Sequence, residues 1–285
     1  MPVSRPSFLT GLIGAPIAQS AAPAMHMQAA DALGVRLHYQ LIEVAGADRE
    51  ALRVLIEGVR RLGFSGINVT FPYKEAVIPL LDELSPSANA IGAVNTIIVR
   101  QGRLVGHNTD TTGFERAVQS LPAAFLRGPV ALIGAGGVGK AIAFALSRMA
   151  VEELRIFDAD RAKAEQLARQ LRDCQGVRRA DSVEEALRGA VGLVNATPVG
   201  MLPNRDMPVP ESLLHRDLWV ADAVYTPLVT PLLAAARAKG AETMTGRDLA
   251  IYQAADAFEL FTGLKPSIAE IGSAFDAVMA ERYGR

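Results

Sequence analysis

The segment from Val130 to Gly139 constrains the fold of this chain more than any other. It reads Val-Ala-Leu-Ile-Gly-Ala-Gly-Gly-Val-Gly, an apolar run that enters a glycine-rich turn and then a helical sequence. In such a turn the first glycine makes the bend, the second lets the backbone approach a pyrophosphate, and the third lets helix and strand pack closely. The first amides of the helix point at the phosphates. The predicted dinucleotide-binding residues are Gly134, Ala135, Gly136, Gly137, Val138 and Gly139.

An acidic residue follows at the distance that a dinucleotide site requires. Asp158 ends the apolar run at 154–157, 24 residues after Gly134. A carboxylate there accepts hydrogen bonds from the ribose hydroxyls of NAD and repels the 2′-phosphate of NADP. Two other interpretations exist: Arg161, and less directly Arg155, could pair with that phosphate, or Asp158 could cap the next helix. We predict NAD as the preferred cofactor and NADP as a poorer substitute.

The rest of the chain indicates an α/β protein with two lobes. Apolar strand-like runs alternate with helical patterns throughout, which is typical of largely parallel sheets. At about 150 residues per domain, a chain of 285 residues predicts about two domains. We expect residues 1–110 with 247–285 to form an N-terminal α/β substrate-binding domain with a mostly parallel sheet. Residues 111–246 are expected to form a Rossmann-type, doubly wound NAD-binding domain, and the helices after Gly246 to pack back onto the first domain.

The expected elements follow from these patterns. In the first domain we expect strands at 8–13, 37–44, 66–69, 94–99 and 104–105, and helices at 24–33, 49–62, 73–84 and 87–91. Gln101-Gly102 predicts a hairpin turn, and so an antiparallel edge in that sheet. In the second domain strands are expected from Val130, at 154–157, 192–195 and 219–224, and near Met244.

Composition excludes several classes of function. The chain has 29 Lys and Arg against 30 Asp and Glu, so it has no overall positive charge to attract nucleic acid or an anionic membrane. Its single cysteine, Cys174, excludes an intrachain disulfide and favours a cytoplasmic protein. No apolar run reaches the roughly 20 residues that span a bilayer. The four histidines lack the spacing of metal ligands, so we expect no metal.

Two polar segments follow expected strands, where ligands collect in α/β folds. They are Asn68-Val-Thr-Phe-Pro-Tyr-Lys74 and Gly106-His-Asn-Thr-Asp110. Taken alone, Lys74 is more simply read as a surface lysine on a helix, and Asp110 as the cap of the helix that follows it.

Seven motifs of the chain, however, resemble those of the shikimate dehydrogenase family in order and spacing. They are Gly14–Ser20, Asn68–Lys74, Gly92–Thr96, Asn108–Asp110, Gly134–Gly139, Asn195–Met201 and Gln253. The resemblance covers nearly the whole chain. It implies a two-lobed enzyme that reversibly reduces 3-dehydroshikimate to shikimate, with the nicotinamide facing the substrate across a cleft.

The same resemblance implies a catalytic pair, Lys74 and Asp110. The chemistry agrees, because hydride delivery to a ketone leaves a developing alkoxide that a nearby ammonium group can stabilise and protonate. In the oxidative direction the lysine must be neutral to accept that proton. Which member of the pair moves the proton therefore stays open.

Other positions match residues that bind ligands in the family. Those matching the substrate pocket are Ser20, Thr70, Asn95, Tyr225 and Gln253. Hydroxyls and amides suit a small cyclic polyhydroxy acid because each can donate and accept hydrogen bonds; Ser20 would hold the carboxylate. Asn195, Thr197 and Gly246 match positions near the cofactor, although they could simply be strand-end and turn residues.

The chain departs from the family's pattern at two places. The carboxylate-binding segment usually reads Ser-x-Ser or Ser-x-Thr, whereas here it is Ser20-Ala21-Ala22. A lost hydrogen bond to a charged group, about 1.5–3 kcal/mol, would weaken shikimate binding roughly ten- to a hundredfold. The second departure is Asp158, which stands where biosynthetic members usually carry a basic patch for NADP.

Together the departures predict an NAD-preferring dehydrogenase that is weaker on shikimate than the biosynthetic enzyme. Alternatives are a dehydrogenase of quinate or an amino analogue of shikimate, a nearly inactive ligand-binding regulatory relative, and a related two-lobed folate dehydrogenase. The expected partners are small molecules only, and the protein is expected to be a monomer or a homodimer.

Overall fold

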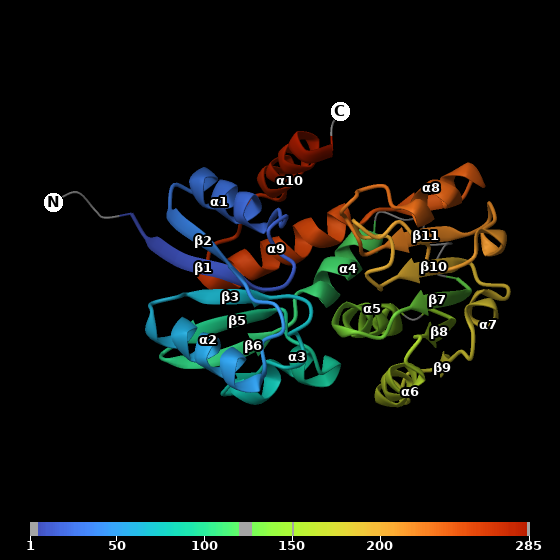
Figure 1. Ribbon diagram of the computed structural model, residues 1–285, viewed down its shortest axis with the longest axis horizontal. Coiled ribbons are helices and arrows are strands. Elements are labelled where there is room, and N and C mark those ends of the chain that lie inside the picture. Colours follow the sequence, from blue (N-terminus) through green and yellow to red (C-terminus); the bar gives the residue numbers. More distant parts are fainter. Residues whose placement is uncertain (1–4, 120–126, 150, 284–285) are drawn as a thin grey trace. The chain divides into compact units, whose positions relative to one another are not determined.

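The computed structural model describes residues 5–119, 127–149 and 151–283. These form two compact units, and each is an α/β sandwich around its own six-stranded sheet (Figure 1). The first unit contains residues 1–109 and 251–285, and the second contains residues 110–250. The chain therefore leaves the first unit after Thr109 and returns to it within a helix. The expected α/β fold class is confirmed.

The first unit contains most of the N-terminal elements and the two terminal helices. Its elements are β1 (Ser7–Gly14), α1 (Ala22–Ala32), β2 (Arg36–Glu43), α2 (Arg49–Arg61), β3 (Gly66–Val69), η1 (Ile78–Leu80), β4 (Glu83–Leu84), α3 (Pro86–Ile91), β5 (Thr96–Arg100), β6 (Arg103–His107), most of α9 (Gly246–Thr262), and α10 (Ile268–Tyr283). The strand order is β2-β1-β3-β5-β6-β4. Strands β1 to β3 are parallel, whereas β5 is antiparallel to both β3 and β6.

Helices cover both faces of this sheet, as the packing of two successive side chains of β5 shows. Ile97 belongs to a core cluster with Leu52 and Ile56 of α2, while the next residue, Ile98, packs with Phe261 of α9. Because successive strand residues point to opposite faces, α2 and α9 lie on opposite sides of the sheet (Figure 1). Helix α10 packs on α1. The terminal helices thus complete the first unit.

The second unit is an all-parallel sheet with the order β12-β11-β10-β7-β8-β9. Its elements are α4 (Asp110–Val118), β7 (Pro129–Ile133), α5 (Gly137–Arg148), β8 (Glu153–Phe157), α6 (Arg161–Gln170), β9 (Val177–Arg179), α7 (Val183–Leu187), β10 (Gly192–Asn195), η3 (Glu211–Leu213), β11 (Trp219–Asp222), α8 (Pro231–Ala238) and β12 (Glu242–Met244). This is the doubly wound dinucleotide-binding order, in which ligands bind beyond the carboxyl ends of the strands at the point where the order reverses. That point lies between β7 and β10.

One expected helix is absent. Residues 73–84, predicted as a helix, instead form turns, the short η1 and β4. Pro79 has no amide hydrogen and so cannot donate the hydrogen bond that an α-helix through this segment would need. The carbonyl of Lys74 accepts from the amide of Val94, at 2.8 Å, and not from the next helical turn. The segment that carries Lys74 is therefore pinned to the sheet as a loop.

The hairpin at Gln101-Gly102 is confirmed. Both residues have positive φ, 52° and 75°, as a two-residue hairpin turn requires, and they join β5 to β6. None of the helices in the described part of the chain combines the length and the hydropathy of a membrane span.

Candidate active site

The glycine-rich turn lies between β7 and α5, at the point where the strand order reverses. Gly134 has a φ of 105°, and a Cβ there would lie 2.9 Å from the backbone of Ala196. A Cβ on Gly139 would lie 2.0 Å from the carbonyl oxygen of Gly134. Around Gly136, the N-cap of α5, a Cβ would meet no atom within 4 Å. The turn therefore combines two tightly packed glycines with one that faces open space, which is the arrangement a pyrophosphate needs.

Asp158 is anchored at the end of β8. Its Oδ2 accepts from the amide of Ala135 in the glycine turn, at 2.7 Å, and its Oδ1 accepts from the amide of Asp160 at 2.8 Å. The cap of helix α6 is Asp160, whose own Oδ1 accepts from Ala162 at 3.1 Å. The helix α6 is therefore capped by Asp160 and not by Asp158, so the alternative role for Asp158 as a helix cap is wrong. Its carboxylate is held beside the turn and fits a ribose diol.

Both arginines that could bind a 2′-phosphate have other partners. Arg161 is exposed, with its Nη1 3.8 Å from a carboxylate oxygen of Asp181. Arg155 is buried in β8, donates to Glu153 at 2.6 Å, and also donates to the carbonyls of Ala186 and Arg188. The guanidinium of Arg155 is thus committed to the protein interior.

Beside the glycine turn, a buried network joins the loops that follow β10 and β11. The side-chain amide of Asn195 donates to Asp222 at 2.9 Å and accepts from the hydroxyl of Thr197 at 2.7 Å. Asp222 also accepts from Thr230, at 2.7 Å, and from the amide of Val224 at 2.9 Å. Burial raises the pKa of Asp222 to about 7, although these three donors oppose the shift.

This network shapes the segments that carry Thr197, Tyr225 and Gly246. The amide of Leu202 donates to the carbonyl of Thr226 at 2.9 Å, so the two loops are joined directly. A Cβ on Gly246 would lie 2.7 Å from the carbonyl of Ala223. Sequence analysis did not single out Asp222. Its only signal was a carboxylate at the end of an otherwise apolar strand.

In the first unit, expected substrate residues follow β1 and β3. A Cβ on Gly14 would lie 2.3 Å from the methyl group of Thr70, so the glycine lets the ends of these strands meet. Ser20 lies just before α1, and its Oγ accepts from the amide of Ala22 at 3.2 Å. Gln253 lies on the part of α9 that belongs to this unit. Thr70, Ser20 and Gln253 are all partly exposed.

Asn95, by contrast, is buried and held on several sides. Its Oδ1 accepts from the amide of Thr109 at 2.8 Å and from the hydroxyl of Thr96 at 2.9 Å. Its Nδ2 donates to the hydroxyl of Thr109 at 2.9 Å. Thr109 immediately precedes Asp110, so Asn95 also fixes the backbone that enters the second unit.

The two expected catalytic residues are buried ionisable groups. Lys74 is 9% exposed and lies in the loop after β3, whereas Asp110 is 5% exposed and begins α4. Lys74 belongs to the first unit and Asp110 is the first residue of the second. Lys74 is therefore not a solvated surface lysine, whereas Asp110 stands at the start of α4, where the capping interpretation also places it.

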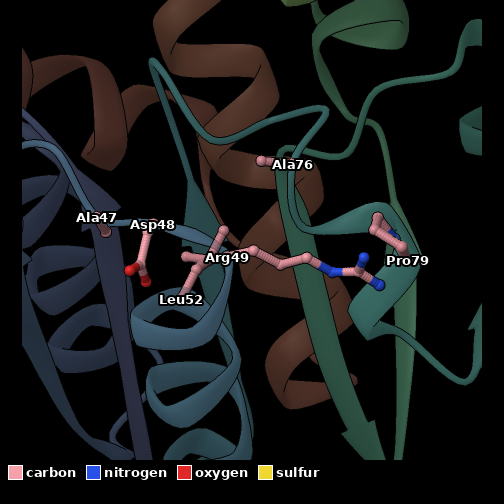
Figure 2. A pocket seen from close by; sticks show the side chains of 6 residues that line it. All are labelled: Ala47, Asp48, Arg49, Leu52, Ala76 and Pro79. Atoms are coloured by element: carbon pink, nitrogen blue, oxygen red, sulfur yellow. The ribbon is translucent and has the colours of Figure 1, made fainter.

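A hollow in the first unit is separate from all of these residues. It has a volume of about 260 Å³ and lies between the start of α2 and the turn before η1, where Arg49 extends toward Pro79 (Figure 2). None of the expected site residues lines it. Among the described residues, no group of three or more potential ligands could hold a metal ion.

Two family models match different parts of the chain. Residues 12–97 match the family described as shikimate dehydrogenase substrate binding domain. Residues 120–226, which include the glycine turn, match the ThiF family.

Close relatives match the chain over nearly its whole length. It is 45% identical over 272 residues to the shikimate dehydrogenase (NADP(+)) of Streptomyces avermitilis, covering 93% of each chain. It is 44% identical over 283 residues to the quinate/shikimate dehydrogenase (NAD(+)) of Corynebacterium efficiens, covering 96% of this chain and 99% of the relative.

A solved structure shows the same fold. The quinate dehydrogenase of Corynebacterium glutamicum in complex with NAD superposes with a TM-score of 0.87 at 41% identity, covering 96% of this chain and all of the other. The expected resemblance is confirmed: the chain belongs to the shikimate/quinate dehydrogenase family and is an NAD(P)-dependent enzyme that acts on a CH–OH group.

Proposed function

We propose that the enzyme preferentially uses NAD, oxidises shikimate to 3-dehydroshikimate reversibly, and accepts quinate as an alternative substrate. Overall similarity does not decide the cofactor, because an NADP-linked and an NAD-linked relative are 45% and 44% identical to this chain. The geometry around Asp158 carries the proposal.

The Asp158 carboxylate is fixed beside the glycine turn by the amides of Ala135 and Asp160. A 2′-phosphate at the ribose would therefore lie next to a carboxylate that cannot easily turn away, and like charges at close range are unfavourable. The ribose hydroxyls of NAD can instead donate to the same oxygens. Since Arg155 is engaged in the interior, it cannot offset the repulsion.

The loop after β3 and the start of α4 supply the groups that we assign to proton transfer. When bound, NAD supplies the acceptor for the hydride of the substrate's CH–OH group. The hydroxyl proton must leave at the same time, and we assign Lys74 and Asp110 to receive and hold it. Burial strengthens the attraction between the Lys74 ammonium group and a developing alkoxide, because the local dielectric is low.

The substrate-binding residues fit a polyhydroxylated ring acid. We assign Ser20 to the carboxylate, and Thr70, Asn95, Tyr225 and Gln253 to the ring hydroxyls. The segment after Ser20 offers no second side-chain hydroxyl, because residues 21 and 22 are both alanine. We therefore propose a higher KM for shikimate than in an enzyme that carries two hydroxyls at this place.

The decisive experiment measures initial rates with NAD and NADP, on shikimate and on quinate, for four proteins: the wild type, Asp158→Asn, Asp160→Asn and Lys74→Ala. The wild type should have at least tenfold higher kcat/KM with NAD than with NADP. Asp158→Asn should move the ratio roughly ten- to a hundredfold toward NADP, because it removes a charged acceptor worth about 1.5–3 kcal/mol. Asp160→Asn is the matched control: it loses a carboxylate from the same turn and should leave the ratio unchanged.

Lys74→Ala tests the chemistry separately from the cofactor. It should lower kcat about a hundredfold or more, as loss of a general acid or base does, and should leave NAD binding unchanged. A wild type that prefers NADP tenfold would overturn the assignment of Asp158. A wild type that binds NAD but turns over neither substrate would favour an amino analogue as substrate or a binding protein.

A further inference from the structure

A chain of buried hydrogen bonds runs across the sheet of the first unit and ends at Asn95. It begins at the hydroxyl of Tyr39 on β2, which donates to Oδ1 of Asn68 on β3 at 2.8 Å. The amide nitrogen of Asn68 donates to the hydroxyl of Thr96 on β5 at 3.0 Å. The hydroxyl of Thr96 donates to Oδ1 of Asn95 at 2.9 Å. We call Tyr39, Asn68, Thr96 and Asn95 the relay.

The direction of the relay is fixed by backbone groups. Nδ2 of Asn68 also donates to the carbonyl of Asn95 at 3.2 Å, and a carbonyl can only accept. Oδ1 of Asn95 accepts from the amide of Thr109 at 2.8 Å, and an amide can only donate. Neither side-chain amide can therefore be reversed without losing a bond to the backbone. Because Thr96 receives a hydrogen from Asn68, its own hydrogen must go to Asn95.

The relay has little room to move. Tyr39, Asn68 and Asn95 are at most 6% exposed, and Thr96 is completely buried. The ring of Tyr39 stacks on His26 with centroids 4.6 Å apart, and His26 packs in turn against Phe258 and Phe261 of α9. The first donor is thus clamped by the helix that carries Gln253.

We infer that Thr96 is a positioning residue for substrate recognition: its hydroxyl fixes the amide of Asn95 and, through Asn95, the backbone that leads into Asp110. The inference rests on the proposed role of Asn95 in binding a ring hydroxyl. Thr96 has no exposed surface and therefore does not touch the substrate itself, and Asn95 is the proposed substrate residue to which its hydroxyl donates. Without its hydroxyl, Asn95 loses one of the two donors that orient its Oδ1, and Nδ2 of Asn68 loses an acceptor.

The test compares three substitutions of buried threonines. Thr96→Val keeps the shape and removes the hydroxyl, whereas Thr96→Ser keeps the hydroxyl. Thr10→Val is the matched control: Thr10 on β1 is also completely buried, and its hydroxyl donates only to the carbonyl of His38, at 3.3 Å, outside the relay. For each protein we would measure kcat, the KM values of shikimate and NAD, shikimate binding at equilibrium, and the urea midpoint.

Thr96→Val should raise the KM of shikimate about tenfold, the effect of a hydrogen bond of ordinary strength, and leave the KM of NAD within twofold of the wild-type value. Thr96→Ser should restore the wild-type KM. Thr10→Val should lower the urea midpoint without changing the KM of shikimate. If Thr96→Val does not fold, Tyr39→Phe, which removes the first donor of the relay, should raise the KM of shikimate by about threefold.

Two results would overturn the inference: equal shikimate KM values for Thr96→Val and Thr10→Val in an active enzyme, or a Thr96→Ser variant as impaired as Thr96→Val. Both leave the proposed function intact. A wild type that neither turns over nor binds shikimate or quinate would instead overturn the proposed function, and the inference with it.

Discussion

At the scale of single residues, position 22 marks the main chemical departure from the pattern that the chain resembles. Ala22 begins α1, and its amide donates to Oγ of Ser20 at 3.2 Å. The cap residue of this helix, Ala21, offers no side-chain hydrogen bond. The start of α1 therefore presents one side-chain hydroxyl, from Ser20, where the family pattern usually has two.

We predict that Ala22→Ser lowers the KM of shikimate about tenfold, because the new hydroxyl adds a hydrogen bond to a charged group. The value of kcat should change little, since a bond to the carboxylate is made equally in the ground state and the transition state. Steady-state kinetics with saturating NAD measure both values. Ala24→Ser, the same change two residues along the helix, is the control. Equal KM values in the two variants would contradict the assignment of Ser20 and Ala22 to the carboxylate site.

At the scale of elements, the turn between β7 and α5 contains one glycine that matters for stability and another that we expect to matter for cofactor binding. Gly139 and Gly136 belong to the same turn, but an added methyl group meets opposite surroundings at the two positions. At Gly139 it would lie 2.0 Å from a backbone oxygen, and at Gly136 it would meet nothing within 4 Å. The backbone of Gly136 has an ordinary φ of −74°.

Gly139→Ala should therefore lower the free energy of unfolding by about 1–3 kcal/mol, as overpacking does, because α5 must move away from β7. Gly136→Ala should leave stability nearly unchanged and raise the Kd of NAD at least tenfold, because the methyl group occupies space that the pyrophosphate needs. Urea unfolding and NAD titration distinguish the two effects. A Gly136→Ala variant that binds NAD normally would show that the cofactor lies elsewhere.

The same scale shows what the sequence could and could not predict. Two short, fully buried strands were predicted at their observed bounds, Gly66–Val69 and Gly192–Asn195. The helix expected at 73–84 was wrong, because a tertiary hydrogen bond to Lys74 and the proline at 79 outweigh the local helical pattern. Strand β9, Val177–Arg179, was missed because it is short and polar, and its pairing with β8 forms it.

The candidate site was predictable wherever a motif carries it. The residues that bind no ligand themselves, such as Thr96 and Asp222, were not singled out. Thr96 is placed by a hydrogen bond from Asn68 on the neighbouring strand β3, and Asp222 by bonds from Asn195 and Thr230, all distant in sequence. A single sequence shows no such pairing.

At the scale of the whole molecule, each unit contains a buried group whose pKa is strongly shifted by burial, and the two groups respond oppositely to pH. In the first unit, burial lowers the pKa of His26 to about 3. The unfolded chain, with a histidine pKa of about 6.5, binds the extra proton between these values, so the free energy of unfolding rises as pH rises from 3 to 6.5. In the second unit, burial raises the pKa of Asp222 to about 7. Here the folded state binds the extra proton, so the free energy of unfolding falls as pH rises from about 4 to 7.

We therefore predict that two substitutions change the pH dependence of stability in opposite senses. As pH rises from 5 to 8, the free energy of unfolding of Asp222→Asn should increase by about 2–3 kcal/mol relative to the wild type. The reason is that the variant lacks the buried carboxyl group that must lose its proton over that range. As pH falls from 8 to 5, the free energy of unfolding of His26→Phe should increase by about 2 kcal/mol relative to the wild type. The reason is that the variant lacks the imidazole whose protonation favours the unfolded state in acid. Urea unfolding at both pH values measures these differences, and Asp160→Asn, which alters an exposed carboxylate, is the control.

The position of the single tryptophan makes the prediction specific to each unit. Trp219 lies in β11, so its fluorescence reports the second unit, whereas far-ultraviolet circular dichroism reports both. If the units unfold separately, the fluorescence midpoint should respond to Asp222→Asn and not to His26→Phe. If the units unfold together, each substitution should shift the fluorescence midpoint and the circular dichroism midpoint by the same amount. The shifts caused by Asp222→Asn and His26→Phe should still depend on pH in opposite senses. A stability profile that runs parallel to the wild-type profile in either variant would show that the substituted group does not titrate in the folded protein as its burial requires.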